Sequence, residues 1–176
     1  MEIKELFYKD MNNDILKNFN RYQEIAKCWR KENDSWILKD VYYIDDWDNN
    51  EKLDRIISMR ENVQNGHARF FAAFIDGEIV GFSYLRTNLF GKHNEYMNLG
   101  KFHISKDFRN QGIGKSLFKI TCSAAKSMGA EKLYISAHSA EEPMAFYRNI
   151  GCTDAVEINH ELADDEPFDC QLEYIL

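Results

Sequence analysis

The residues best suited to chemistry form one glycine-rich segment past the middle of the chain. They are Arg109, Asn110, Gln111, Gly112, Ile113, Gly114, Lys115 and Ser116. Glycines let a backbone approach a ligand closely, and unpaired N–H groups at a helix N-terminus attract an anion with the helix dipole assisting. Apolar residues at helical spacing follow the segment, so it predicts a phosphate-binding turn that opens a helix. An ordinary helix-capping turn is the alternative.

Two well-known phosphate motifs fail on counting. A Walker A loop, GxxxxGK[ST], would use Gly114, Lys115 and Ser116 but requires glycine where Arg109 stands. A Rossmann GxGxxG requires glycine where Leu117 stands. What remains is RxxGxG.

A second block lies downstream, where residues 145–152 read Ala-Phe-Tyr-Arg-Asn-Ile-Gly-Cys. RxxGxG after a strand ending in Phe102, His103 and Ile104, then another strand and an FY-x-x-x-G block, resembles the GNAT N-acetyltransferase superfamily. The two blocks come in family order with family spacing. The resemblance is clear over residues 69–154 and vague before them.

The resemblance implies how acetyl-CoA is held. Main-chain groups of Phe102, His103 and Ile104 would align the pantetheine arm like an added strand. Backbone amides from Arg109 to Gly114, with the Lys115 and Ser116 region, would hold the pyrophosphate. Acetyl-CoA is then the cosubstrate, and no metal is expected because neither the four cysteines nor the five histidines show ligand spacing.

Tyr147 is the catalytic residue that the resemblance implies. It would lie near the thioester sulfur and protonate the departing thiolate after direct attack by a neutral primary amine. A phenol with a pKa near 10 can donate to a thiolate of comparable basicity. A strand N–H would polarise the carbonyl, so no covalent intermediate is required. The alternative is a core aromatic beside Phe146.

Two departures from the family leave the general base unassigned. Many relatives have asparagine seven residues before the tyrosine, whereas this chain has Ala140, with Ser139 and His138 nearby. Some relatives have a glutamate base on the bulged strand, and the corresponding position is Asn98. The candidates for a relay through water are Glu95, His103 and His138.

The acceptor can be approached only through charge. An acidic and aromatic cluster lies in the segment expected to border the acceptor groove, and it consists of Asp40, Tyr42, Tyr43, Asp45, Asp46, Trp47 and Asp48. Carboxylates beside aromatic rings can hold a cationic amine, which favours a small cationic acceptor over a protein amine. A helix N-cap with a solvated loop is the alternative.

Several elements must position these residues. The pattern predicts a strand over residues 1–7, a helix over 13–28, an irregular stretch over 29–47 and a helix over 50–63. Strands over 69–74 and 78–85 flank Asp76-Gly77, a type I′ hairpin signal. Strands over 132–137 and 170–176 follow, and the last completes the sheet or forms a homodimer contact.

The alternation of apolar residues changes phase within the strand predicted over residues 95–104. Met97 and Leu99 share one face by alternation, but Phe102 and Ile104 fall on the opposite parity. One extra residue near Gly100 restores the phase, which is typical of a β-bulge that splays neighbouring strands and frees backbone groups for a ligand. A strand buried on both faces is the alternative.

These elements predict an α+β, three-layer fold with a mixed, mainly antiparallel sheet of about six or seven strands and helices on both faces. Its bulged fourth strand is splayed from the fifth. We expect one N-acetyltransferase domain over residues 1–176, with a variable acceptor-side part (1–68), an acetyl-CoA-binding core (69–154) and C-terminal strands (155–176).

Composition narrows the partners. The net charge of −7 argues against nucleic acid, and the chain shows neither a signal peptide nor a membrane span, so we expect a cytoplasmic protein. Three functions remain open. An active N-acetyltransferase is favoured over a catalytically silent acyl-CoA-binding or regulatory module, and a nucleotide-binding protein comes third.

Overall fold

The computed structural model describes residues 1–33 and 35–176 and contains a seven-stranded sheet with the order β1-β4-β5-β6-β7-β9-β8. The sheet strands are β1 (Glu2–Leu6), β4 (Ala68–Ile75), β5 (Glu78–Phe90), β6 (Tyr96–Ile104), β7 (Lys132–Ala137), β8 (Thr153–Asp154) and β9 (Cys170–Ile175). The helices are α1 (Asn49–Gln64), α2 (Ile113–Ser127), α3 (Glu141–Asn149) and α4 (His160–Asp165), with short 3₁₀ turns at Tyr8–Asp10 and Lys106–Phe108. Neighbouring strands are antiparallel except β6 and β7, which are parallel.

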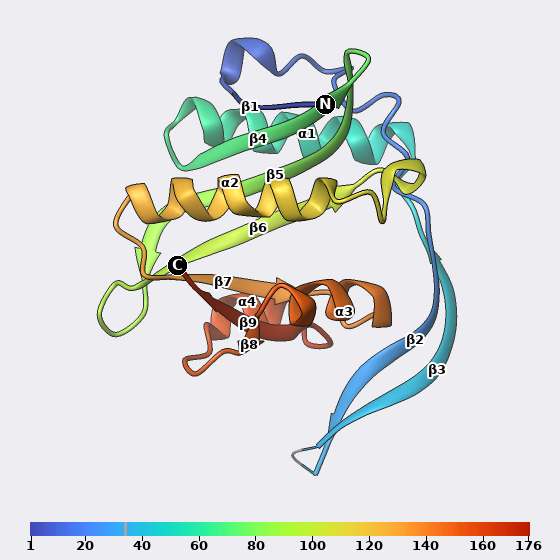
Figure 1. The fold of residues 1–176 in the computed structure, drawn as a ribbon, viewed down its shortest axis with the longest axis vertical. Coiled ribbons are helices and arrows are strands. Elements are labelled where there is room, and N and C mark those ends of the chain that lie inside the picture. The colour runs from blue at the N-terminus through green and yellow to red at the C-terminus, as the bar shows by residue number, and fades with distance from the viewer. Residues whose placement is uncertain (34) are drawn as a thin grey trace.

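Helices cover both faces of the sheet, as predicted. In Figure 1, α2 and α3 lie in front of the strands, whereas α1 and α4 lie behind them. One core cluster joins Leu117 of α2 and Met144 of α3 to the sheet, and another joins Ile56 of α1 to Phe82 of β5. The predicted α+β class is therefore confirmed. None of the described helices is long and apolar enough to cross a membrane.

The β4–β5 hairpin has the predicted turn. Asp76 and Gly77 have φ values of 51° and 84°, as a type I′ turn requires at both central positions. The turn brings β4 beside β5, and β5 in turn pairs with β6, so a two-residue signal in the sequence specifies part of the sheet that carries the site.

The predicted β-bulge occurs at Gly100. Tyr84 pairs with Lys101 and Leu85 pairs with Leu99, so Gly100 has no partner on β5. On its other side, β6 pairs with β7 only from Tyr96 to Asn98. Beyond that point the two strands separate, and main-chain groups of β6 face an open space.

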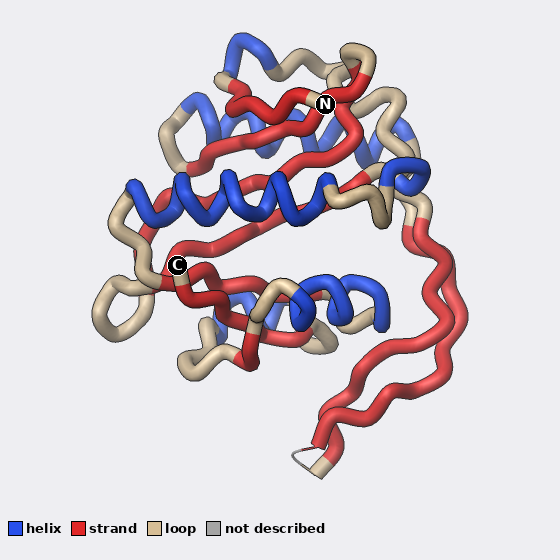
Figure 2. Tube along the Cα trace, in the orientation of Figure 1, coloured by secondary structure: helices blue, strands red, loops and turns tan. Residues whose placement is uncertain are grey.

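Two predictions for the N-terminal third are wrong. Residues 13–28 are not a helix, and 29–47 are not irregular. Instead β2 (Gln23–Glu32) and β3 (Ser35–Asp45) form a two-stranded antiparallel sheet. Figure 2 shows it as a long arm that projects from the body and curves beneath α3.

Asparagine side chains explain why the helical spacing of residues 13–28 misleads. Asn12 Oδ1 accepts from the N–H of Asp14 at 2.9 Å, and Asn20 Oδ1 accepts from the N–H of Tyr22 at 3.2 Å. Such local bonds satisfy backbone groups outside a helix. Leu16 and Phe19 are still buried, but from a turn rather than from a helix.

Candidate active site

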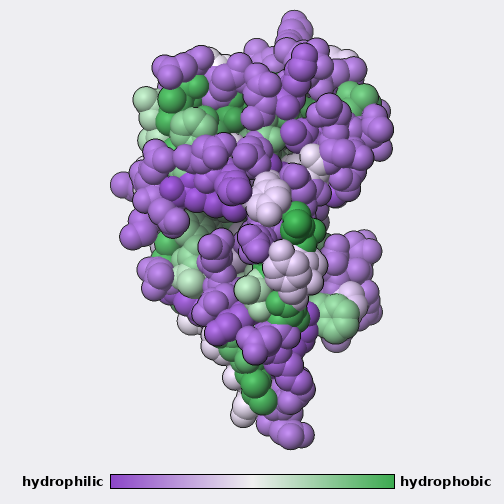
Figure 3. Space-filling view, turned by 90° about the vertical axis from the view of Figure 1, so that its right-hand side faces the viewer, coloured by the Kyte–Doolittle hydropathy of each residue, from purple (hydrophilic) through white to green (hydrophobic). Residues whose placement is uncertain are grey.

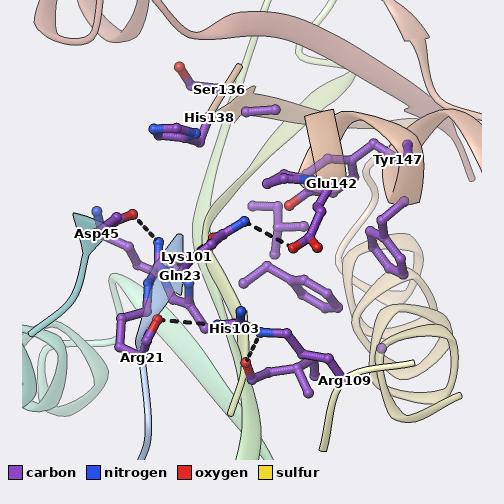
Figure 4. A pocket seen from close by; sticks show the side chains of 18 of the residues that line it. Arg21, Gln23, Asp45, Lys101, His103, Arg109, Ser136, His138, Glu142 and Tyr147 are labelled. Carbon is purple, nitrogen blue, oxygen red and sulfur yellow. Dashed lines mark hydrogen bonds and ion pairs between the residues drawn. The ribbon is translucent and has the colours of Figure 1, made fainter. Parts of the chain in front are cut away.

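A cavity of about 990 Å³ opens where β6 and β7 separate. The glycine-rich segment and the start of α3 border it on one side, and the base of the β2–β3 arm borders it on another. Figure 4 shows side chains from these elements turned toward a common space. In Figure 3, which faces the arm, the surface is mainly hydrophilic, with hydrophobic side chains running along its lower part.

The glycine-rich segment presents unpaired amides to this cavity. Main-chain N–H groups of residues 110–115 donate no hydrogen bond to any described residue. Asn110 and Gly112 have φ values of 61° and 81°, and a Cβ added at Gly112 would meet nothing within 4 Å. Eight residues of the predicted cofactor-binding set line the cavity. They are Gly112, Gly114, Phe102, His103, Ile104, Arg109, Asn110 and Lys115. Free amides at a helix N-terminus beside a lysine suit a pyrophosphate.

Three residues of the predicted set do not line the cavity. Ile113 is buried against β4 and β5. The side chain of Gln111 donates to the carbonyl of Asp107 at 3.0 Å, and the hydroxyl of Ser116 donates to the carbonyl of Gly112 at 3.3 Å. The N–H groups of Ile113 and Gln111 donate to no described residue, whereas the N–H of Ser116 already donates to the carbonyl of Gly112.

Arg109 faces inward. Its Nε donates to the carbonyl of Ile104 at 3.1 Å, and its Nη2 donates to the carbonyl of Arg21 at 3.2 Å. Removal from solvent lowers the pKa of the Arg109 guanidinium, and Glu142 opposes that effect. Arg109 thus ties the end of β6 to the N-terminal segment and holds the loop that carries the free amides.

Tyr147 lies on the wall where the strands separate. It is 7% exposed, and its ring packs against Phe102 and Phe146 with centroids 6.4 and 5.3 Å apart. Its hydroxyl makes no hydrogen bond within the described part of the chain. Burial raises the pKa of Tyr147, and Cys152 and Asp169 add to the effect. The phenol is therefore protonated at neutral pH and free to donate.

Glu95 and His138, two of the three residues predicted to relay a proton, are poorly placed to act as a general base. Glu95 does not line the cavity, and its carboxylate accepts from the N–H of His93 at 2.8 Å. His138 lines it, but its Nε2 is 2.9 Å from the Tyr43 hydroxyl and its Nδ1 accepts from the N–H of Ala140 at 3.1 Å. Both nitrogens of His138 are engaged.

His103 remains accessible. Its ring packs edge-on against Trp47, with centroids 4.8 Å apart, and faces the cavity in Figure 4. Burial, and then the cations Arg21, Lys101, Arg55 and Arg109, hold its pKa well below the usual range. The imidazole is therefore neutral, but it is a weak base in a cationic setting.

Ala140 and Asn98, the two positions at which the chain departs from the family pattern, have surroundings that the structure describes. The N–H of Trp29 donates to the carbonyl of Ser139 at 2.7 Å, and Cys28 forms an antiparallel bridge with Ala140. The main chain of residues 139–140 is therefore paired with the β2–β3 arm. Neither Ser139 nor Asn98 lines the cavity.

The acidic and aromatic cluster predicted to hold an amine is dispersed. Only Asp45 and Trp47 of its members line the cavity, and Asp45 forms an ion pair with Arg21. Asp48 caps α1, accepting from two amides of the first turn. The helix N-cap that was the alternative reading is therefore correct for Asp48.

Carboxylates that the sequence analysis did not single out lie in the cavity instead. They are Glu142, Glu166 and Asp169. Burial first, and then repulsion from Glu166, raises the pKa of Asp169 to about 6. The acidic run before the last predicted strand was the one signal in the sequence that could have found Glu166 and Asp169. No described residues form a group of three or more His, Cys, Asp and Glu arranged to hold a metal ion.

The chain is similar to known proteins in sequence and in fold. The sequence model of the acetyltransferase (GNAT) family matches residues 19–152. An N-alpha-acetyltransferase of Sulfurisphaera tokodaii is 27% identical over 115 residues, which cover 60% of this chain and 69% of that protein.

Two solved structures share the fold over nearly the whole chain. One is a candidate streptothricin acetyltransferase from Bacillus anthracis in complex with acetyl coenzyme A, with a TM-score of 0.70, 18% identity, and coverage of 99% of this chain and 96% of that one. The other is nourseothricin acetyltransferase, with a TM-score of 0.66, 15% identity, and coverage of 98% and 95%.

Proposed function

The chain belongs to the acetyltransferase (GNAT) family. On that premise we propose that it is an acetyl-CoA-dependent N-acetyltransferase, in which a primary amine attacks the thioester directly. The favoured acceptor is small and cationic. A catalytically silent acyl-CoA-binding module is the alternative.

One observation carries the proposal. A single cavity joins the free amides of Asn110, Gly112, Gly114 and Lys115, the unpaired edge of β6 beyond Asn98, and the unbonded hydroxyl of Tyr147. A pyrophosphate, an extended pantetheine arm and a thioester need these three features in this order along one path. We assign the pyrophosphate to the amides, with Lys115 beside them, and the pantetheine arm to the main chain of Phe102, His103 and Ile104. The carbonyl of Ile104 already accepts from Arg109, so the contribution of Ile104 is its N–H.

The reaction needs no covalent enzyme intermediate. A neutral amine attacks the thioester carbonyl, the new C–N bond forms and the C–S bond breaks. Tyr147 gives its proton to the thiolate, and the cationic nitrogen loses a proton that restores the phenol through solvent. A main-chain N–H of β6 stabilises the oxyanion, because a dipole fixed before the reaction costs no reorganisation during it.

The cavity supports a small acceptor. The β2–β3 arm borders the cavity and pairs with residues 139–140, so it restricts the space open to an acceptor. Glu142, Glu166 and Asp169 supply the negative charge that attracts a protonated amine. A protein amino terminus is the second candidate, favoured by the relative named as an N-alpha-acetyltransferase.

We further propose that residues 1–176 act as one cytoplasmic domain, with residues 1–68 shaping the acceptor side and 69–154 holding acetyl-CoA. The 155–176 segment, expected as strands, also contains α4 and the carboxylates Glu166 and Asp169. β9 lies between β7 and β8 in the sheet, and β8 pairs with it only at Leu172 and Glu173.

A thiol-release assay tests the function. Acetyl-CoA is offered with a panel of primary amines that includes spermidine, glucosamine and a hexapeptide with a free amino terminus. We expect enzyme-dependent release of CoA with a small cationic amine, and selective turnover of the hexapeptide would favour the second candidate. Thermal stabilisation by CoA with no turnover of any amine would support the silent module, since a ligand that binds the native state raises its stability.

A further inference from the structure

The carboxylate of Asp169 lies where the two central strands separate. Asp169 immediately precedes β9, and the β7–β9 register pairs Ala137 with Cys170. Asp169 is therefore beside the end of β7, in the part that no longer pairs with β6. It lines the same cavity as Tyr147.

Asp169 and Tyr147 approach this cavity from opposite faces of the sheet. Ile135 and Ala137 pack into the core beneath α2 and α3, the layer that carries Tyr147. Side chains alternate along a strand, so Ser136 points to the other face. The Ser136 hydroxyl donates to Oδ2 of Asp169 at 3.3 Å, which places the carboxylate on that face.

A directed series of hydrogen bonds fixes the position of Asp169. The N–H of Asn159 donates to the Tyr134 hydroxyl at 3.1 Å, and Tyr134 donates to Gln171 Oε1 at 2.7 Å. Gln171 Nε2 then donates to Ser136 Oγ at 3.0 Å, and Ser136 donates to Asp169. The series ends on Oδ2, whereas Oδ1 of Asp169 accepts from no described residue. One oxygen is held in place and the other is available to the cavity.

The groups around Asp169 give it useful basicity. Burial and the charge of Glu166 raise its pKa to about 6, while the Ser136 hydrogen bond and the Lys101 ammonium oppose them. A carboxyl with this pKa is mostly ionised at pH 7 yet is a stronger base than an exposed aspartate. A base works best when its pKa lies near the operating pH.

We propose that Asp169 is the general base that accepts a proton from the ammonium of the acceptor before attack. The proposal rests on the acetyl transfer proposed above. Oδ1 takes the first proton, the neutral amine attacks the thioester, and Tyr147 protonates the departing thiolate from the other face. The cationic nitrogen of the adduct loses a second proton, which restores the phenol through solvent. Asp169 then releases its proton to solvent, so the cycle yields one acetylated amine, one CoA thiol and one proton.

His103 is the competing base, and its surroundings disfavour it. Arg21, Lys101, Arg55 and Arg109 all act on it as cations, so they repel an ammonium as well as weakening the base. Asp169 and Glu166 attract the same ammonium, and of these four cations only Lys101 is among the charges that act on Asp169. Electrostatic attraction and proton transfer therefore act at one place.

The pH dependence of kcat/KM tests the proposal with the amine of the panel that gives the largest value. With wild type, kcat/KM should rise to an inflection near pH 6 and then stay level up to the pKa of the amine. Asp169→Asn should lose roughly 10²- to 10⁴-fold at pH 7. Its kcat/KM should also rise tenfold per pH unit through neutrality, because only amine that is already neutral reacts.

Three variants separate a chemical role from a structural one. Asp164→Asn changes an exposed carboxylate on α4 that does not line the cavity, and it should retain the wild-type profile. Glu166→Gln removes the repulsion and should move the inflection to lower pH. Ser136→Ala removes the donor to the carboxylate and should move it to higher pH.

The outcomes are distinguishable. An Asp169→Asn variant that keeps the inflection near pH 6 and most of its activity overturns the proposal while leaving acetyl transfer intact. The same holds if the loss is equal at every pH, since that indicates a structural defect. If wild type releases no thiol with any amine, the proposed function fails, and the assignment of Asp169 fails with it.

Discussion

Gly114 lies directly against the ring of Phe146. A Cβ added at Gly114 would be 3.1 Å from Cε2 and 3.4 Å from Cζ of that ring, so the absence of a side chain lets α2 and α3 approach closely. Gly112 is different, since a Cβ there would meet nothing within 4 Å while its φ of +81° disfavours any side chain. Gly112 and Gly114 therefore have different structural roles.

Replacing each glycine with valine should separate these roles. Gly114→Val overpacks the helix contact and should lower the free energy of unfolding by about 1–3 kcal/mol. Gly112→Val imposes a strained φ, which costs about 1–2 kcal/mol, and also adds bulk beside the free amides. We expect Gly112→Val to weaken CoA binding more strongly than its loss of stability explains.

Urea unfolding and calorimetric titration with CoA measure the two effects. Gly66→Val is a suitable control, because Gly66 also has a positive φ and open surroundings but lies far along the chain from the motif. A folded Gly112→Val variant with wild-type affinity for CoA would remove the phosphate role from this turn.

Arg109 should stabilise the fold through its hydrogen bonds to two main-chain carbonyls. Arg109→Lys cannot reach the carbonyls of both Ile104 and Arg21, and an unsatisfied buried carbonyl costs about 1–3 kcal/mol. The matched Arg148→Lys variant changes a more exposed arginine that pairs with Asp154 and donates to the carbonyl of Cys152 at 3.3 Å, and it should cost under about 1 kcal/mol because lysine can keep the ion pair. Equal losses of unfolding free energy in urea would contradict the anchoring role of Arg109.

Asp169 should reduce the stability of the fold at neutral pH. Its folded pKa of about 6 lies above the value of about 3.9 in an unfolded chain, so the folded state binds the proton more tightly. The penalty is present above pH 6 and vanishes as the pH falls toward 4. Asp169→Asn should therefore raise the free energy of unfolding by about 1–2 kcal/mol at pH 7.5 and leave it nearly unchanged at pH 4. A variant that is less stable at pH 7.5 would argue against the raised pKa.

Tyr147→Phe should retain packing and acetyl-CoA affinity but lose the proton donor. We expect kcat to fall roughly 10²- to 10⁴-fold, and the fall should shrink with an acyl donor whose thiolate is less basic. Single-turnover kinetics are needed, because slow product release can hide a change in chemistry. An unaltered single-turnover rate would remove Tyr147 from the reaction, and a variant that fails to fold would favour the core-aromatic alternative.

Local chemistry accounts for what the sequence could predict. The Asp76-Gly77 turn and the phase change around Gly100 are specified by neighbouring residues, and both occur as expected. The pattern over residues 13–28 failed because Asn12 and Asn20 form local turns and because β2 gains its stability from pairing with β3. Strand pairing of that kind is a tertiary effect that a spacing of apolar residues does not contain.

Asp169 shows the same limit at the level of the site. Glu166 lies three residues before it, but the main cause of its raised pKa is burial, and Ser136 and Lys101, which oppose the rise, are remote in sequence. The predicted members of the site, by contrast, lie in two short runs, 102–104 and 109–116, and at Tyr147. Motifs therefore predict an acetyl-CoA side whose residues largely line the cavity, whereas the carboxylates proposed for the acceptor side emerge only from the folded chain.

The distance between the CoA sulfur and the Tyr147 hydroxyl in a crystal of the CoA complex tests the central claim most directly. We predict that the sulfur lies in the gap between β6 and β7, within roughly 3–4 Å of the hydroxyl. The diphosphate should contact the amides of residues 110–115. A sulfur beyond the reach of Tyr147, or a diphosphate bound away from those amides, would contradict the account.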